Sequence, residues 1–376
     1  MELMKLVLMV SMAVEALPRP VHDLPNYNKK SGLGPTVFEI IEAANKDEGV
    51  PVFLKERDIA IITARNVRTC SECMWNKTEN GIVEVPYLTD PQYSIAEAAL
   101  ISRALKEFEL LTCVHFVKRS SELDYLYIWP GVGCWSYIGK TLGMQIVSLA
   151  SPRCMVYGVI QHEAMHNLGF YHEHTRKDRD DYIDILWENI EPGFSDSFDI
   201  VKSNTLHLSY DYASVMHYHQ YAYSIAEDLP TIVPKPDPNV PIGQRSGMSN
   251  LDIMKINALY DCNLCREKLM NVTGSFSGNS SFANQHGGNC LWLIQVTGRK
   301  ILLVLDYVSF SSTDSIKVYD GSIKSSLVLL DKTGAFQAYQ IKPLVSSGCS
   351  ILVEYVSKAN AKLGEFDMSY YTVSLG

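Results

Sequence analysis

The stretch HEAMHNLGFYHEHTRKDRD, residues 162–180, decides the fold of this 376-residue chain. Residues four apart lie on one face of a helix, so His162 and His166 can direct two imidazoles at a single ion while Glu163 lies beside them. A bare HExxH pattern also occurs in helices that bind no metal. The residues that follow it distinguish the two cases.

The chain can leave this helix at Gly169, because glycine tolerates the backbone conformations of a tight turn. That turn brings His172 round as a third nitrogen ligand and leaves a fourth position for water, as in a catalytic rather than a closed structural zinc site. Residues 214–218 read SVMHY, a tight turn that would place Met216 beneath the imidazoles. Because two separated segments agree on one site, we interpret the histidines as zinc ligands rather than as core residues of an inert fold.

The run 162–180 resembles the signature of the astacin family of metzincin zinc endopeptidases, and SVMHY resembles its Met-turn. The resemblance covers about residues 66–262, and within the family it is nearest to secreted hatching enzymes and their oocyte and embryonic relatives. These relatives carry an extra cysteine pair near the mature N-terminus, as Cys70 and Cys73 do here. Further segments resemble the family in the same order: TCVHFV (112–117), GCWSYIGKTLGMQIVSL (133–149), YDYASVMHY (210–218) and VPIGQRSGMSNLDIMKINALYDC (240–262).

The resemblance and the chemistry of zinc sites together assign roles around the metal. Glu163 would take the proton from the attacking water and deliver it to the leaving amine. Tyr218 would stabilise the oxyanion that forms on the substrate. Met216 would support the zinc site by packing alone. Glu173, which follows the third histidine, would hold the α-amino group that is freed when a propeptide is removed.

An α+β metzincin-type domain with two lobes and a cleft between them is the expected fold. Strands are predicted upstream of the zinc helix, and mostly irregular chain downstream. The segment Gln145 to Leu149 would form the upper edge of the cleft, where an extended substrate adds as a strand. The predicted strands are Ile82 to Tyr87, His115 to Val117, Tyr125 to Trp129 and Gln145 to Leu149. A helix is predicted over Ser94 to Glu109, with Ile95, Ala98, Ala99, Ile101, Leu105 and Phe108 on its apolar side.

The chain after Cys262 changes to short strands separated by Gly, Ser and Asn, which predicts an all-β sandwich of about a hundred residues. The phrases YVSFSSTDSIKVYDGS (307–322) and GEFDMSYYTV (364–373) resemble a CUB domain. We therefore expect a zinc protease domain over residues 66–262 and a CUB-like domain over residues 265–376.

The first residues predict secretion. Residues 1–16 carry Lys5, an apolar run and small residues near the end, which is the pattern of a signal peptide too short to span a membrane. The alternative is a buried N-terminal helix. The net charge of −9 argues against non-specific binding to nucleic acid or to anionic membranes. We expect an extracellular protein, with storage in secretory or cortical granules as one route to release.

Residues 17–65 have the position of a propeptide, with a helix predicted over Val37 to Asn45. By its place, Asp58 resembles the aspartate with which astacin propeptides ligate the zinc and hold the enzyme latent. The family usually has Gly before this Asp and Phe two residues earlier, whereas this chain has Arg57 and Lys55. A solvated carboxylate is the alternative for Asp58. Cleavage after Arg65 would make Asn66 the mature N-terminus.

Nine cysteines in a secreted chain imply disulfides with one thiol left over. The resemblance implies the pairs Cys113–Cys262 and Cys134–Cys154, to which we add Cys70–Cys73 and Cys265–Cys290. Cys349 is then unpaired and is expected to be a buried thiol, with an intermolecular bridge as the alternative. A redox or zinc role for Cys70 and Cys73 is disfavoured because no thioredoxin-like pattern follows. Candidate glycosylation sequons begin at Asn76, Asn271 and Asn279.

Two functions from different classes fit these observations. The first is a secreted zinc endopeptidase, activated by loss of its propeptide, that cleaves extended segments of extracellular proteins such as those of an egg envelope or embryonic matrix. A growth-factor or procollagen processing protease shares this chemistry but usually carries several CUB and EGF-like modules. The second is a catalytically weak adhesion protein that uses the CUB domain at an egg coat or matrix surface. The intact metal ligands and Glu163 favour the enzyme.

Overall fold

The computed structural model describes residues 35–46, 53–61, 73–358 and 364–374. The expected signal peptide, the expected cleavage point between Arg65 and Asn66, and Cys70 lie outside these residues. Within the described ranges, no helix has the length and apolar character needed to cross a membrane. The expected propeptide is described in two pieces, helix α1 (Val37–Asn45) and a hairpin of β1 (Leu54–Lys55) and β2 (Ile59–Ala60).

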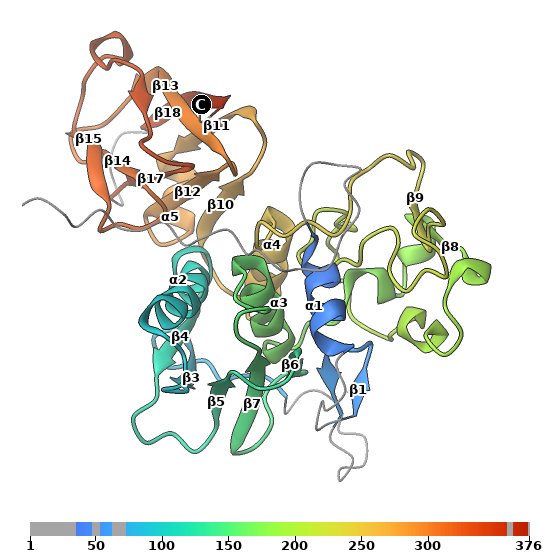
Figure 1. Ribbon diagram of the computed structural model, residues 1–376. Coiled ribbons are helices and arrows are strands. Elements are labelled where there is room, and N and C mark those ends of the chain that lie inside the picture. Colours follow the sequence, from blue (N-terminus) through green and yellow to red (C-terminus); the bar gives the residue numbers. More distant parts are fainter. Residues whose placement is uncertain (1–34, 47–52, 62–72, 359–363, 375–376) are drawn as a thin grey trace, which may run out of the picture. The chain divides into compact units, whose positions relative to one another are not determined.

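A seven-stranded sheet lies upstream of the zinc helix (Figure 1), in the order β1-β2-β6-β7-β5-β3-β4. The neighbours from β7 to β4 run parallel, β6 is antiparallel to β7, and the propeptide strand β2 adds in parallel to β6. The strands of the protease region are β3 (Val83–Thr89), β4 (Val114–Lys118), β5 (Tyr125–Trp129), β6 (Cys134–Tyr137) and β7 (Met144–Leu149).

Strand β6 was not predicted, and its presence changes the expected cleft. Its four residues lie between Gly133 and Gly139 and are too few to show an alternating pattern. Because β6 lies between β7 and β2, the segment Gln145 to Leu149 is internal to the sheet. The prediction that this segment forms the edge of the cleft was therefore wrong, and β6 is the protease strand on which the propeptide hairpin lies.

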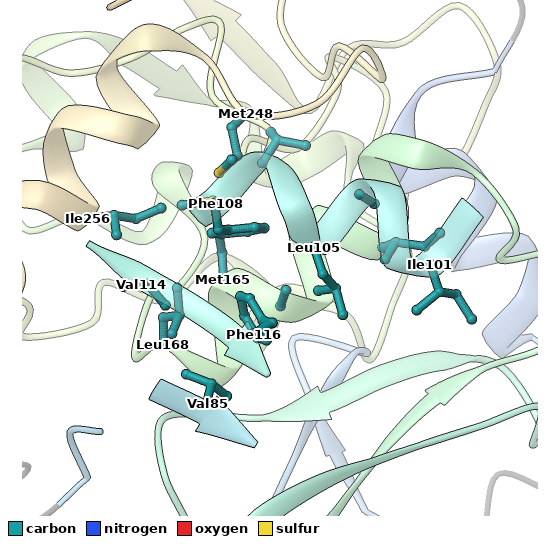
Figure 2. Packing of buried hydrophobic residues seen from close by; sticks show 14 of the residues in the cluster. Val85, Ile101, Leu105, Phe108, Val114, Phe116, Met165, Leu168, Met248 and Ile256 are labelled. Atoms are coloured by element: carbon teal, nitrogen blue, oxygen red, sulfur yellow. The ribbon is translucent and has the colours of Figure 1, made fainter. Parts of the chain in front are cut away.

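The apolar face of helix α2 (Ile95–Leu111) packs against strand β4 of the sheet and against the zinc helix α3 (Tyr157–Asn167). A capping box between Ser94 and Glu97 fixes its first turn. Ile95 is 92% exposed, contrary to prediction, because the helix begins there and its buried face starts only at Ile101. Figure 2 shows the core behind the zinc helix, which includes Ile101, Leu105, Phe108, Val114, Phe116, Met165 and Leu168.

The chain downstream of the zinc helix is mostly irregular, as predicted, with short 3-10 helices and helix α4 (Asn250–Leu259). A two-stranded antiparallel sheet joins β8 (Ile183–Ile185) to β9 (Ile232–Pro234), which lies much further along the chain. It has its own buried cluster, which we call the lower-lobe cluster. Besides Phe38 of helix α1, this cluster contains Ile183, Ile190, Phe198, Tyr210, Tyr218, Ala222, Tyr223, Ile232 and Ile242.

The C-terminal region contains two β-sheets that share one apolar core. The five-stranded sheet has the order β10-β12-β17-β14-β15 and the four-stranded sheet the order β11-β18-β13-β16. This pair of sheets agrees with the predicted all-β sandwich. The elements are β10 (Cys265–Leu269), β11 (Thr273–Asn279), α5 (Ser280–Gln285), β12 (Asn289–Gln295), β13 (Arg299–Ser309), β14 (Ser315–Asp320), β15 (Leu327–Thr333), β16 (Leu344–Val345), β17 (Ser350–Val356) and β18 (Glu365–Ser374).

Disulfides join three of the expected cysteine pairs. Sγ–Sγ bonds connect Cys113 with Cys262, Cys134 with Cys154, and Cys265 with Cys290. The first of these closes a loop with a sequence separation of 149 residues and so ties the end of the protease region to strand β4. The expected Cys70–Cys73 pair cannot be followed because Cys70 lies outside the described residues. Cys349 is unpaired among the described cysteines and is partly exposed, not buried as predicted.

Candidate active site

Helix α3 carries the first two candidate ligands through the interior of the protease region. Every residue from Gly158 to Asn167 is buried. Met165 packs into the apolar core (Figure 2), while His162 and His166 share another face of the helix. The chain then turns at Gly169, whose φ of +104° suits glycine. This turn brings the ring of His172 to 4.9 Å from the ring of His166.

The three imidazoles converge on the carboxylate of Asp58. Nε2 of His162 lies 3.2 Å and Nε2 of His172 3.1 Å from Asp58 Oδ2. Nε2 of His166 lies 3.7 Å from Asp58 Oδ1. One ligand atom from each of these buried residues lies within 4.8 Å of the others. The structure therefore brings together the three predicted metal ligands and the predicted latency ligand.

Hydrogen bonds at Nδ1 orient the two imidazoles of the helix. Nδ1 of His162 donates to the carbonyl oxygen of Val215 at 2.9 Å, and Nδ1 of His166 donates to that of Phe170 at 2.7 Å. Because a carbonyl oxygen only accepts, Nδ1 carries the proton and Nε2 keeps its lone pair. This is the tautomer in which an imidazole binds a metal, held by a partner outside the ligand set.

Several buried atoms at this centre have no hydrogen-bond partner within the described part of the chain. They are Nε2 of His166, Oδ1 of Asp58 and both carboxylate oxygens of Glu163. Polar atoms left in this state are costly and call for an explanation. Imidazole nitrogens and a carboxylate oxygen are ligands that zinc prefers, and the burial of the cluster would exclude competing water. The residues thus fit a zinc ion held by His162, His166 and His172, with Asp58 alongside.

The pKa values of the two carboxyl groups at the centre, Glu163 and Asp58, are shifted in opposite directions. Burial and the charge of Asp58 raise the pKa of Glu163 well above its ordinary value. Burial opposes ionisation of Asp58 as well, but the charge of His172 and the hydrogen bonds from the imidazoles outweigh it and hold the pKa of Asp58 well below its ordinary value. Neighbouring carboxylates with opposite shifts are a common arrangement at sites that move protons.

The Met-turn lies under the imidazoles and is fastened to helix α4. Ser214 Oγ donates to one oxygen of Asp252 at 2.6 Å, and the amide of Val215 donates to the other at 2.9 Å. Met216 is 1% exposed, and its carbonyl accepts from the amide of Glu173 at 3.0 Å. The turn therefore connects the helix exit to α4, and the thioether of Met216 contributes by packing.

Tyr218 follows the Met-turn and contacts the expected propeptide. Its hydroxyl donates to the backbone carbonyl of Glu56 at 2.7 Å. Its ring lies 4.7 Å from the ring of His172 and stacks on His174 at 3.8 Å. The phenol that is expected to assist the reaction thus lies beside the metal ligands but is already occupied by another oxygen.

Glu56 was missed by the sequence reasoning. Its carboxylate lies 2.6 Å from Nδ1 of His172 and is almost completely buried. The expected propeptide therefore contacts the third ligand twice, through Glu56 at one nitrogen and through Asp58 at the other. The sequence shows only that Glu56 is an acidic residue two positions before Asp58. Its contact with His172 depends on the turn that the chain makes between Glu56 and Asp58, which the sequence does not reveal.

That turn explains why the family has Gly where this chain has Arg57. Arg57 has φ of +71° and Glu56 of +50°, values in the left-handed region that disfavours side chains other than glycine. The guanidinium of Arg57 lies 4.2 Å from the ring centre of Phe194 and donates to the carbonyl of Gly193 at 3.1 Å. These contacts offset the cost of the backbone conformation.

Comparison with known proteins identifies the family to which this site belongs. A family model for Astacin (Peptidase family M12A) matches residues 71–261. This chain belongs to the astacin family. It is 40% identical over 362 residues to the astacin-like metalloendopeptidase of Gallus gallus, which covers 94% of this chain and 88% of that protein. It is 41% identical over 344 residues to embryonic protein UVS.2 of Xenopus laevis, covering 90% of this chain and 66% of that one.

A solved structure agrees with the assignment. High choriolytic enzyme 1, a hatching enzyme zinc-protease from the medaka fish Oryzias latipes, is 45% identical and superposes with a TM-score of 0.50 over 53% of this chain and 98% of that one. Membership of the family makes this astacin a metalloendopeptidase, and its cluster of imidazoles is the zinc site.

Glu173 of this astacin already has partners in the structure. Its Oε2 accepts from Lys255 Nζ at 2.6 Å, and its Oε1 accepts from Arg176 at 3.1 Å and from the amide of Asp211 at 2.9 Å. Glu173 and Lys255 are both buried. A freed α-amino group would therefore join a carboxylate that Lys255 and Arg176 already neutralise. Lys255, on helix α4, is a second residue that the sequence reasoning missed.

We expect Lys255→Met to lower the free energy of unfolding by about 3 kcal/mol, since removing one partner of a buried pair leaves an uncompensated charge. The value lies at the lower end of the usual range because Arg176 and the amide of Asp211 remain. The measurement is guanidinium unfolding of the full chain. Lys106→Met is the matched control, since Lys106 is exposed and its pair with Glu109 should contribute less than ~1 kcal/mol. Equal losses in the two variants would contradict the structural role of Lys255.

The three sequons lie on the surface. Asn76, Asn271 and Asn279 are all exposed, so a glycan at any of them would project into solvent. Asn279 also caps helix α5, where its side chain accepts from the amide of Phe282 at 2.8 Å. Glycosylation at these positions remains a prediction.

Proposed function

We propose that this protein is a secreted endopeptidase, made as a latent zymogen and activated by cleavage after Arg65. The proposal divides the chain into a signal peptide (1–16), a propeptide (17–65), the zinc protease domain (66–262) and a CUB-like domain (265–376). The observation that carries it is the Asp58 carboxylate, which lies where the three imidazoles converge. The propeptide strand β2 supports it further, since it covers β6 in the manner expected of an extended substrate.

The propeptide residues explain latency through separate contacts. Asp58 takes the place that water or a substrate oxygen needs beside Nε2 of His162 and His172. Glu56 engages His172 with its side chain and Tyr218 with its carbonyl. Cleavage after Arg65 would let these residues leave together.

In the activated enzyme, zinc supplies a Lewis acid that polarises the scissile carbonyl and makes water more acidic. Glu163 accepts a proton from the attacking water and passes it to the leaving amine. Burial is the main cause of the raised pKa of Glu163, and the charge of Asp58 adds to it, so departure of Asp58 lowers this pKa and favours the carboxylate that acts as base. Tyr218, released from the carbonyl of Glu56, donates to the oxyanion as charge develops there.

The substrates that we propose are proteins of an egg envelope or embryonic matrix. The proposal rests on likeness to high choriolytic enzyme 1, described as a hatching enzyme, and to an embryonic protein. The adhesion alternative is less well supported, because it gives no reason for three imidazoles that converge in one buried cluster beside a Glu163 side chain that lacks hydrogen-bond partners among the described residues.

The test compares the full chain before and after limited trypsin treatment. We expect the intact chain to leave casein and a solubilised egg-envelope protein uncut, and the trypsin-treated chain to cut both and to lose this activity with a zinc chelator. One zinc ion per chain should be found by metal analysis. A trypsin-treated chain that binds zinc and cuts neither protein would favour the adhesion alternative.

A further inference from the structure

Helix α1 of the propeptide bridges the two lobes of the protease domain. Its buried residues Val37, Ile40, Ile41 and Ala44 belong to the core behind the zinc helix. Phe38 belongs instead to the lower-lobe cluster and is 1% exposed. The helix contacts α3 and β6, the elements that carry two zinc ligands and the propeptide strand. Phe38 is thus a propeptide side chain inserted into the lower lobe beside the cleft.

Aromatic rings of the lower lobe surround Phe38. The ring of Tyr218 stacks on it at a centroid distance of 3.6 Å and an interplanar angle of 28°. The ring of Tyr223 meets it edge-on at 5.3 Å, and His219 lies at 5.9 Å. Such ring pairs stabilise a buried aromatic side chain beyond the area that it removes from water.

Residues of the protease domain support the rings of Tyr218 and Tyr223 that surround Phe38. Tyr223 stacks on Phe194 at 4.5 Å, and Tyr218 stacks on His174 at 3.8 Å. Neither support comes from the propeptide, so these rings should keep their places when α1 leaves. This site also lies beside the metal ligands, because the ring of His172 lies 6.3 Å from that of Phe38, edge-on, and 4.7 Å from that of Tyr218.

We propose that the place filled by Phe38 is a specificity subsite, in which Tyr218, His219 and Tyr223 receive an aromatic or large apolar side chain of the substrate. The inference rests on the proposed function, since it requires α1 to depart with the propeptide. Phe38 then occupies in the zymogen the subsite that a substrate side chain occupies in the active enzyme. Burying such a side chain rather than alanine corresponds to about a 10- to 100-fold preference.

The test uses the full chain after limited trypsin treatment and a set of peptides that differ at one position by Phe, Leu, Ala, Asp or Lys. Each position around the scissile bond is varied in turn. We expect one position to favour Phe and Leu over Ala by at least about 10-fold in kcat/KM, and over Asp and Lys by more. The same ratios are measured as Kd with trypsin-treated Glu163→Gln, by fluorescence anisotropy, so that binding is read without hydrolysis.

Variants locate the preference. Tyr223→Ala should lower the Phe-to-Ala ratio at that position by about 10-fold, because the ring that meets Phe38 edge-on is lost. Tyr221→Ala is the matched control, since Tyr221 is 42% exposed and should leave the ratio unchanged. The ratio is internal to each variant and does not depend on the yield of folded enzyme. Tyr223→Leu serves in place of Tyr223→Ala if the latter does not fold.

The outcomes separate this inference from the proposed function. Hydrolysis without an aromatic or apolar preference at any position, or with a preference for Asp or Lys only, overturns the subsite and leaves the protease standing. Absence of hydrolysis together with a Kd ratio that favours Phe overturns the proposed function and supports the subsite. An equal loss of the ratio in Tyr221→Ala and Tyr223→Ala contradicts the placement.

Discussion

Glu163→Gln should reduce kcat/KM of the trypsin-activated chain by about 10²- to 10⁴-fold, the range that a positioned acid–base group contributes. The amide has nearly the shape of the carboxylate but accepts no proton from water at neutral pH. Since both oxygens of Glu163 lack partners among the described residues, the substitution breaks no hydrogen bond of the side chain. The fold and the imidazoles should therefore remain as they are. The measurement is hydrolysis of a fluorogenic peptide, with zinc content determined on the same sample.

Glu188→Gln is the matched control for this change. Glu188 lies in the same protease region and is exposed, so its substitution should alter kcat/KM by less than about twofold. Loss of zinc together with activity in Glu163→Gln would show that the carboxylate serves the metal rather than the proton transfer. Full activity in this variant would exclude Glu163 as the base.

The difference between what the sequence predicted and what it missed has a physical basis. His162, His166 and Gly169 are local signals, because helix periodicity and one turn fix their relation within a few residues. Asp58 was found by its position relative to a known pattern. Phe38 acts only through contacts with residues far along the chain, and no local periodicity reports such contacts.

The errors have the same origin. Ile95 has the right spacing for the apolar face of α2 but comes before the point where the helix meets the sheet, so it is exposed. Strand β6 is too short to show alternation, yet the propeptide hairpin lies on it. Arg57 departs from the family pattern at the residue whose positive φ explains that pattern. Local sequence therefore indicated the chemistry of the site, whereas its surroundings required the structure.

Asp58→Ala should make the uncleaved chain active, raising its peptidase activity by about 10- to 100-fold. The carboxylate oxygen Oδ2 lies 3.2 Å from Nε2 of His162 and 3.1 Å from Nε2 of His172, and contacts of a charged group are worth roughly 1.5–3 kcal/mol each. Alanine leaves space for water at the place where the imidazoles converge. The variant is made with Arg65→Gln so that cleavage cannot contribute, and the chain is shown to be intact by mass spectrometry. A small peptide substrate is used, because β2 still pairs with β6 and Phe38 still stacks on Tyr218.

Glu56→Gln, made in the same Arg65→Gln chain, separates the two propeptide carboxylates. It removes the charge beside Nδ1 of His172 but keeps the backbone carbonyl that holds Tyr218. We expect its activity to rise less than that of Asp58→Ala, because Asp58 still occupies the convergence point. If Asp58→Ala is as inactive as the Arg65→Gln chain while Glu56→Gln becomes active, latency depends on His172 and Tyr218 rather than on the metal position. Activity in neither variant would assign latency to the strand β2 and to Phe38, which exclude substrate by occupying its place.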